Sequence, residues 1–118
     1  MTQDLSLQHR AVSDFLELSG TTGVLTRDQI EFFHKNGYVA GVRILTTPQV
    51  EQLRDELSGL FDPQHDGRDL WHEYHANESV DPNTVLFHSL GAWRVRPGFH
   101  DLLWHPTLIR MAGQLLDG

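Results

Sequence analysis

Apolar residues in the first part of the chain recur with roughly helical spacing. Over residues 4–18 they form a short, weak stripe, and Gly20 follows as a helix stop. Thr26 and Gln29 have the spacing of a capping box, in which each side chain bonds the backbone of the other residue. Asn36-Gly37 then supplies a left-handed end. We therefore predict two helices here, joined by a loop over residues 21–23.

The next two segments have different hydrophobic patterns, the first typical of a strand and the second of a helix. Residues 38–45 are a run of β-branched and aromatic residues, which is typical of a strand. Thr47-Pro48 places a helix cap before a proline at the first helical position. The apolar positions that follow share one stripe with charged residues opposite: Val50, Leu53, Leu57, Leu60 and Phe61. This stripe is the clearest helix signal in the chain.

Residues 62–83 lose this periodicity and gain Pro, Gly, Asp and His. A connection of this length is uncommon in a compact domain and tends to be functional or mobile. Residues 84–87 and 92–95 are predicted strands, with a bend at Gly91. We expect a long irregular segment followed by a short, bent strand region.

Two helices complete the pattern. Pro97 begins the first, and His105-Pro106 interrupts it. The second ends at Gly118 and has its apolar positions on one side: Leu108, Met111, Ala112 and Leu115. The predicted fold class is α+β, mostly helical, because two or three short strands cannot close a sheet.

Composition narrows the classes of function. A chain of 118 residues fits one domain, and without cysteine it has no disulfide, thiolate nucleophile or cysteine-ligated metal. A formal charge of −7 argues against nucleic-acid binding. No apolar run approaches the ~20 residues of a membrane-spanning helix, and no export signal is evident. The expected location is the cytoplasm.

The 8 histidines are the one compositional hint of chemistry, but their spacing suits no known site. His72 and His75 lie three apart around Glu73, whereas a zinc-protease helix needs histidines four apart. Glu31 and His34 form a single Glu-x-x-His pair, and a di-iron bundle needs two. No histidine is followed two residues later by an acid, so the His-x-Asp of an iron(II) facial triad is absent. Glycine-rich phosphate loops and a Gly-x-Ser-x-Gly nucleophile turn are absent as well.

An ordered set of motifs resembles a known family. Residues 25–39 read Leu-Thr-x-x-Gln-x-x-Phe-x-x-x-Asn-Gly-Tyr-Val, and residues 50–57 read Val-x-x-Leu-x-x-Glu-Leu. Residues 99–106, Phe-His-Asp-Leu-Leu-Trp-His-Pro, lead into Leu-Leu-Asp-Gly at the end of the chain. Together they resemble the amino-terminal part of the phytanoyl-CoA dioxygenase family, a branch of the iron(II)- and 2-oxoglutarate-dependent oxygenases. The resemblance covers residues 25–118, and residues 1–24 form a preceding helix and loop.

The resemblance implies an oxygenase that uses iron(II), 2-oxoglutarate and O2 to hydroxylate an organic substrate on a jelly-roll core. In family order the His-x-Asp, the distant His and the 2-oxoglutarate-binding Arg all follow the residues printed here. We therefore expect an incomplete oxygenase domain that has no catalytic, cofactor or metal residue and is inactive alone. The irregular segment is a candidate border of the substrate entrance, through Trp71, His72, Tyr74 and His75.

Two other interpretations stay open. One is a stand-alone, non-enzymatic interaction module that buries Trp93 and Trp104 against a partner. The other is a histidine-based metal carrier, which needs a third ligand beside His72 and His75. The incomplete domain is expected to self-associate through its strand edges at residues 38–45 and 84–95 and through the two tryptophans.

Overall fold

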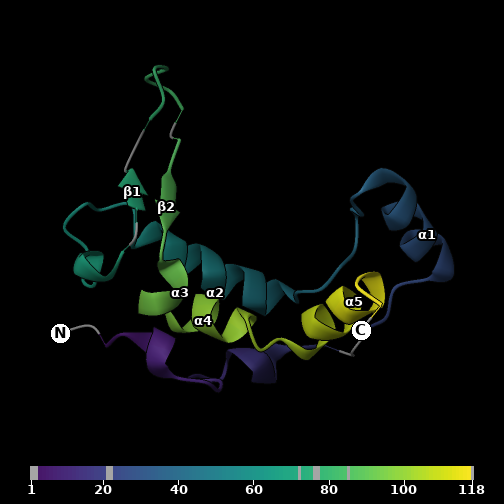
Figure 1. Ribbon diagram of the computed structural model, residues 1–118. Helices are drawn as coiled ribbons and strands as arrows, with labels where there is room; N and C mark the ends of the chain where they lie inside the picture. The colour runs from purple at the N-terminus through teal and green to yellow at the C-terminus, as the bar shows by residue number, and fades with distance from the viewer. Residues whose placement is uncertain (1–2, 21–22, 72, 76–77, 85, 118) are drawn as a thin grey trace.

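A computed structural model describes residues 3–20, 23–71, 73–75, 78–84 and 86–117. Figure 1 shows a helix-rich chain with one small sheet, as the α+β prediction requires. The α-helices are α1 (Arg27–Asn36), α2 (Thr47–Ser58), α3 (Ala92–Val95), α4 (Pro97–Leu102) and α5 (Pro106–Leu115). The strands are β1 (Glu73–His75) and β2 (His88–Leu90), and three 3₁₀ turns are η1 (Leu5–Leu7), η2 (Phe15–Leu18) and η3 (Arg68–Leu70).

The two long early helices begin at capping boxes. At α1 the amide of Thr26 donates to Gln29 Oε1 at 2.8 Å and the amide of Gln29 donates to Thr26 Oγ1 at 3.2 Å, as predicted. Gly37 ends α1 at φ 81°, a left-handed conformation that favours glycine. The cap of α2 is Thr46 rather than Thr47, because Gln49 stands three residues after Thr46 and completes the box there.

Four predicted elements were wrong. Residues 4–18 form two separate 3₁₀ turns instead of one helix, and residues 38–45 contain no strand. Residues 92–95 form α3, and the described part of 84–87 is not a strand; Val85 lies outside the described residues. The turn into α3 depends on Gly91, which has φ 141° and lies so close to Trp71 that a Cβ would come within 3.2 Å of its Cα.

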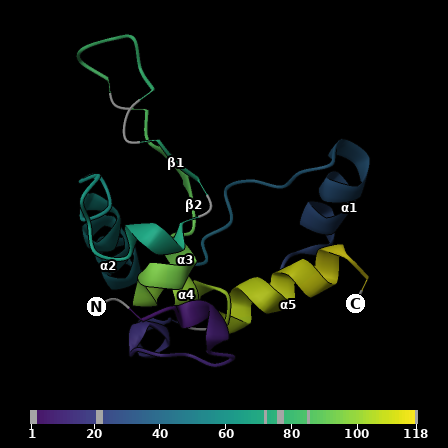
Figure 2. The same ribbon diagram turned by 60° about the vertical axis from the view of Figure 1, so that its left-hand side comes forward.

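The two strands form an antiparallel ribbon. Glu73 pairs with Leu90 and His75 with His88, and the chain between them extends outward as an arm. Figures 1 and 2 both show the arm projecting from the body made by α2, α3 and α4. A two-stranded ribbon is marginal by itself in water, so the arm depends on contacts at its base.

The chain is more open than its length requires. The radius of gyration is 16.5 Å, whereas a compact chain of this length has about 13.5 Å. The accessible surface is 8053 Å², about 1,500 Å² more than the ~6,500 Å² of a compact protein of this mass. In the described part of the chain the buried apolar residues are few: Leu5, Phe15, Leu25, Leu60, Val95 and Met111. The helices therefore leave much of their apolar surface uncovered.

Candidate functional site

The uncovered surface lies along the segment that joins α1 to α2. In Figure 1, residues 38–45 run as an extended chain between the end of α1 and the start of α2. Among the residues that the structure describes, no backbone N–H or C=O of this segment has a hydrogen-bond partner. Extended backbone without partners is the condition of an unpaired edge strand. Residues 38–45 thus have the sequence pattern of a strand, but the described part of the chain provides no second strand to pair with them.

Gly41 decides which side chains of this segment face the helices. Val39 on one side of it and Val42 and Ile44 on the other are half-buried, whereas Arg43 is exposed. Strict alternation cannot place residues 39 and 42 on one side. Gly41 has φ 74° and nothing near its missing side chain, so its role is to shift the alternation by one residue, as in a β-bulge.

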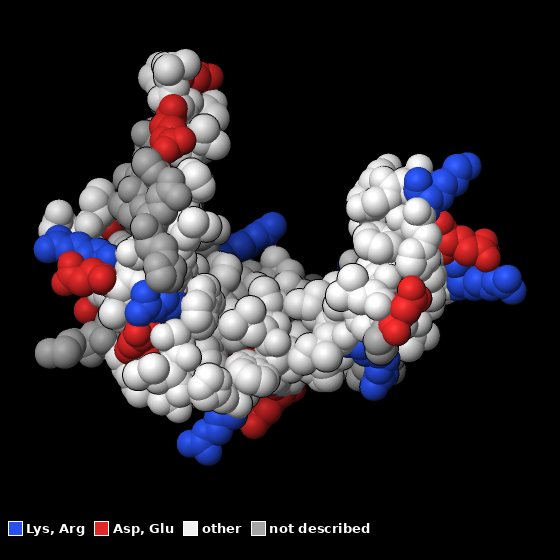
Figure 3. Space-filling model, viewed as in Figure 1, with Lys and Arg blue, Asp and Glu red and all other residues white. Residues whose placement is uncertain are grey.

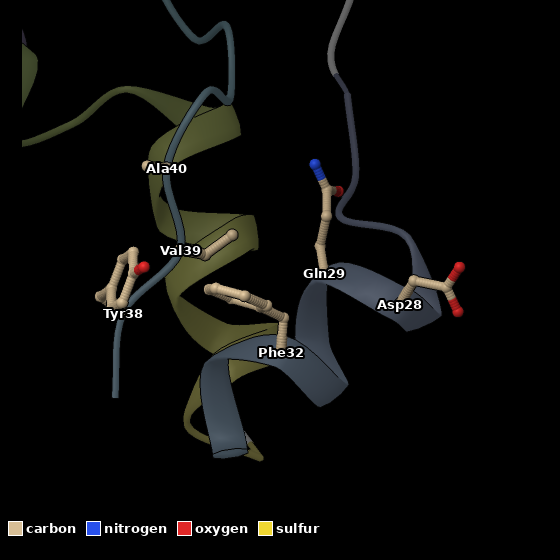
Figure 4. Close-up of a pocket in the computed structure, with 6 residues that line it drawn as sticks. All are labelled: Asp28, Gln29, Phe32, Tyr38, Val39 and Ala40. Carbon is tan, nitrogen blue, oxygen red and sulfur yellow. The ribbon is translucent and has the colours of Figure 1, made fainter. Parts of the chain in front are cut away.

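Three adjoining hollows follow the segment and form one surface, which we call the open face. Figure 4 shows the first, of about 410 Å³, where Phe32 of α1 points toward Val39. The second, of about 260 Å³, lies between residues 39–44 and α5 and is lined by Leu108 and Met111 among others. The third, of about 530 Å³, continues along residues 41–45 to Val50 of α2. The second and third hollows share Leu108, so the surface runs unbroken from α1 to α2.

The open face carries little charge. The only charged residues that line the three hollows are Asp28 and Arg43, although the chain has a net charge of −7. In Figure 3 most of the coloured charged groups lie on the outer surfaces, and the hollow between the two ends is largely white. A small-molecule site usually has a few converging polar groups, and the second hollow has none. The composition suits docking of an apolar protein surface.

The apolar stripe of α2 is only partly covered. Leu60, just past the helix, is fully buried, but Val50, Leu53 and Leu57 are half-buried and Phe61 is 44% exposed. The face of α2 that sequence periodicity assigns to a core therefore has no complete core against it.

The opposite side of the molecule is closed by residues 4–19, which we call the N-terminal strap. The strap runs alongside residues 94–105 and is tied to them by polar contacts in chain order. Asp4 Oδ2 accepts from Arg94 Nη2 at 2.6 Å, the Gln8 carbonyl faces His100 Nε2 at 3.0 Å, and Ser19 Oγ lies 3.4 Å from His105 Nε2. These contacts fix the strap at its beginning, middle and end.

The centre of the strap is held by Asp101, which is fully buried. Its carboxylate accepts from the amide of Val12 at 2.8 Å and from the amide and hydroxyl of Ser13 at 2.9 and 2.6 Å. His100 Nδ1 lies 3.0 Å from the same carboxylate. Burial alone would raise the pKa of Asp101, but the bonds from Ser13, His100 and the Val12 amide outweigh it and lower the pKa. The group is therefore a carboxylate at neutral pH.

His105, at the start of α5, is another buried titratable group of this seam. Its burial lowers its pKa, because the charged ring would lose its water. Nδ1 is buried and has no hydrogen-bond partner among the described residues. Gln49 Nε2 donates to Ser19 Oγ at 2.9 Å, so the Ser19 hydroxyl is free to donate to a neutral His105.

Of the four residues predicted at a substrate entrance, the structure describes the side chain of Trp71 alone. Trp71 is half-buried, with its ring 5.2 Å from that of His65 and 6.4 Å from that of Phe87. Tyr74 and His75 belong to β1, and His72 lies outside the described residues. Trp71 thus belongs to an aromatic cluster at the base of the arm. Trp93 and Trp104 are each 36% exposed, on α3 and after α4, so neither forms a core.

The described residues do not fit the iron site that the resemblance implies. Within them, no three His, Asp or Glu side chains converge to hold a metal ion. The best local pair, His100 and Asp101, is adjacent in sequence, and both carboxylate oxygens of Asp101 accept bonds from the strap. Sequence periodicity did not reveal these two buried polar residues, because their partners in the strap lie about 90 positions away.

In the described part of the chain no helix is long and apolar enough to cross a membrane. Comparison of the chain with protein families, with curated proteins and with solved structures found no match.

Proposed function

We propose that this chain is the helical amino-terminal portion of a phytanoyl-CoA dioxygenase-like oxygenase and that it supports the catalytic core without carrying the chemistry. Its open face packs against the sheet of a jelly-roll core. In this proposal the whole oxygenase hydroxylates an organic substrate with iron(II), 2-oxoglutarate and O2. The residues of this chain supply packing surface and no step of that reaction.

One observation carries the proposal: a continuous, charge-poor face beside a segment of unpaired extended backbone. The chain as a whole, arm and open face together, exposes about 1,500 Å² more surface than a compact protein of its mass, and a standard interface takes ~800 Å² from each partner. Half-buried apolar positions on α2 and α5 and an unpaired strand-like segment are what a helical layer presents to a sheet. The motifs of residues 25–39 and 99–106 support the choice of family.

The proposal is tested by reconstitution. The jelly-roll core of a family oxygenase, produced without its helical portion, is mixed with this chain, and complex formation is measured by sedimentation and 2-oxoglutarate consumption by assay. We expect a one-to-one complex and recovered turnover. Core that neither binds the chain nor gains activity would refute the proposal.

Two neighbouring residues of α5 give a matched pair of variants. Leu108 lines two of the hollows, whereas Ile109 is 54% exposed and lines none of the three. Leu108→Asp puts a charge in the docking face and is expected to abolish the complex, because a buried unpaired carboxylate is strongly unfavourable. Ile109→Asp makes the same chemical change on the next residue and should bind normally. Equal binding by both variants would show that the open face is not the interface.

A further inference from the structure

The unpaired backbone of residues 42–45 offers a strand edge that a second copy of the chain can satisfy. Arg43 and Leu45 have free amide and carbonyl groups within the described structure. Thr46 does not, because its amide donates to Gln49 Oε1 and its carbonyl accepts from Val50. Two-fold antiparallel pairing is self-complementary, since the same residues meet on both copies.

The residues themselves select one register. Pairing centred on Arg43 places two guanidinium groups directly opposite, which is unfavourable. Pairing centred on Val42 brings the left-handed Gly41 into the ladder. Pairing centred on Ile44 avoids both. There Arg43 and the second copy's Leu45 exchange N–H···O bonds, and the occupied groups of Thr46 stay outside the ladder.

The exposed surface area and the scarcity of charged residues in the hollows both favour a second copy of the chain as the partner that covers the open face. The chain exposes about 1,500 Å² more surface than a compact protein of its mass; part of this excess is the projecting arm, and a stable dimer needs ~800 Å² from each partner. The hollows contain only Asp28 and Arg43 as charged residues, so the negative charge of the chain lies mainly outside the contact. Packing of the paired strands over α5 supports a ribbon that is marginal alone.

We propose that the isolated chain forms a symmetric dimer in which residues 42–46 of two copies pair as antiparallel strands centred on Ile44. The dimer uses the open face of the proposed function and rests on that face being uncovered, but it needs no oxygenase core. Because each copy carries −7 charges, we infer that added salt strengthens the association by screening their repulsion.

The absence of cysteine from the chain allows a direct test. Directly opposed residues of a non-hydrogen-bonded antiparallel pair lie about 4.5 Å apart at Cα, which is within disulfide range. Ile44→Cys is therefore expected to form a disulfide with its copy under mild oxidation at least ~5-fold faster than Glu51→Cys. Glu51 is a suitable control because it is exposed on α2 and lines none of the three hollows.

Sedimentation of the unsubstituted chain, at low and high salt, complements the cross-link and does not depend on a variant folding. A dimer that strengthens with salt, with rapid cross-linking at position 44, supports the proposal. A monomer at about 100 µM, or equal cross-linking at positions 44 and 51, overturns it. A monomer that still binds the jelly-roll core refutes only the dimer, so the two proposals fail separately.

Discussion

The buried carboxylate of Asp101 holds the N-terminal strap, and its replacement tests that role. Asp101→Asn keeps the size of the side chain and one acceptor oxygen but turns the other oxygen into an NH2 group. Whichever way the amide is oriented, its NH2 group faces a backbone N–H donor, that of Ser13 or that of Val12. The variant thus loses about two bonds to a charged group and sets donors against donors.

The expected loss follows from these contacts. Hydrogen bonds to a charged group contribute ~1.5–3 kcal/mol each, partly offset because the amide is easier to bury, so Asp101→Asn should lower the free energy of unfolding by about 2–4 kcal/mol. Ser13→Ala removes the 2.6 Å bond from the hydroxyl to Asp101 and the 3.2 Å bond from the Phe15 amide to Ser13 Oγ, and should cost about 1–2 kcal/mol. Both are measured by urea unfolding followed by tryptophan fluorescence.

Asp14→Asn is the matched control, because Asp14 is exposed and its side chain does not cap η2. It should change the unfolding free energy by less than about 0.5 kcal/mol. If Asp101→Asn is too unstable to fold, amide exchange at residues 12 and 13 in Ser13→Ala reports the loosened strap. Equal stability of Asp101→Asn and Asp14→Asn would refute the role of Asp101.

Three further predictions follow from other parts of the structure. A Cβ at position 98 would lie 2.8–2.9 Å from the Glu56 carboxylate that accepts the Gly98 amide, so Gly98→Ala should cost about 1–2 kcal/mol in urea unfolding; an unchanged midpoint would contradict this. The pKa values of His105 and Asp101 are both lowered by folding, so stability should fall as pH drops below the ordinary 6.5 of His and fall again below 3.8. Asp101→Asn should reduce the second decline and leave the first; part of the second remains, because the hydrogen bond from Arg94 also lowers the pKa of Asp4. Iron(II) titration should reveal no tight one-to-one site, and calorimetry showing one would contradict the proposed non-catalytic role.

Local signals in the sequence predicted the helices well. The capping box at Thr26, the stop at Gly37 and the prolines at residues 97 and 106 act within one helical turn, and each appears in the structure. The last helix was predicted to end at Gly118, but α5 ends at Leu115; Gly118 itself lies outside the described residues. These elements could be predicted because their causes are adjacent in sequence.

The errors arose where distant residues decide. A helix over residues 4–18 would have bonded its own backbone N–H and C=O groups. In the structure Asp101 and His100, about 90 residues away, bond the middle of the strap instead. Residues 38–45 have the composition of a strand, yet a strand also requires a partner, and none is present in the described chain. Residues 92–95 are β-branched and aromatic in part, but the approach of Gly91 to Trp71 turns them into α3.

The candidate site was only partly foreseeable. Sequence reasoning singled out residues 38–45 as an edge, and the structure shows their backbone open. It also directed attention to Trp71 and His75, whereas the open face lies along α5 and α2. Apolar periodicity shows that a face needs covering, but not whether the same chain covers it.

The exposure of residues 38–45 is the central claim, and amide hydrogen exchange of the dilute, monomeric chain measures it most directly. The account predicts that the amides of residues 42–45 exchange at nearly unprotected rates, while those of Val12 and Ser13, bonded to Asp101, exchange much more slowly. Protection of residues 42–45 equal to that of Val12 and Ser13 would show that the segment is already paired, and would contradict the open face.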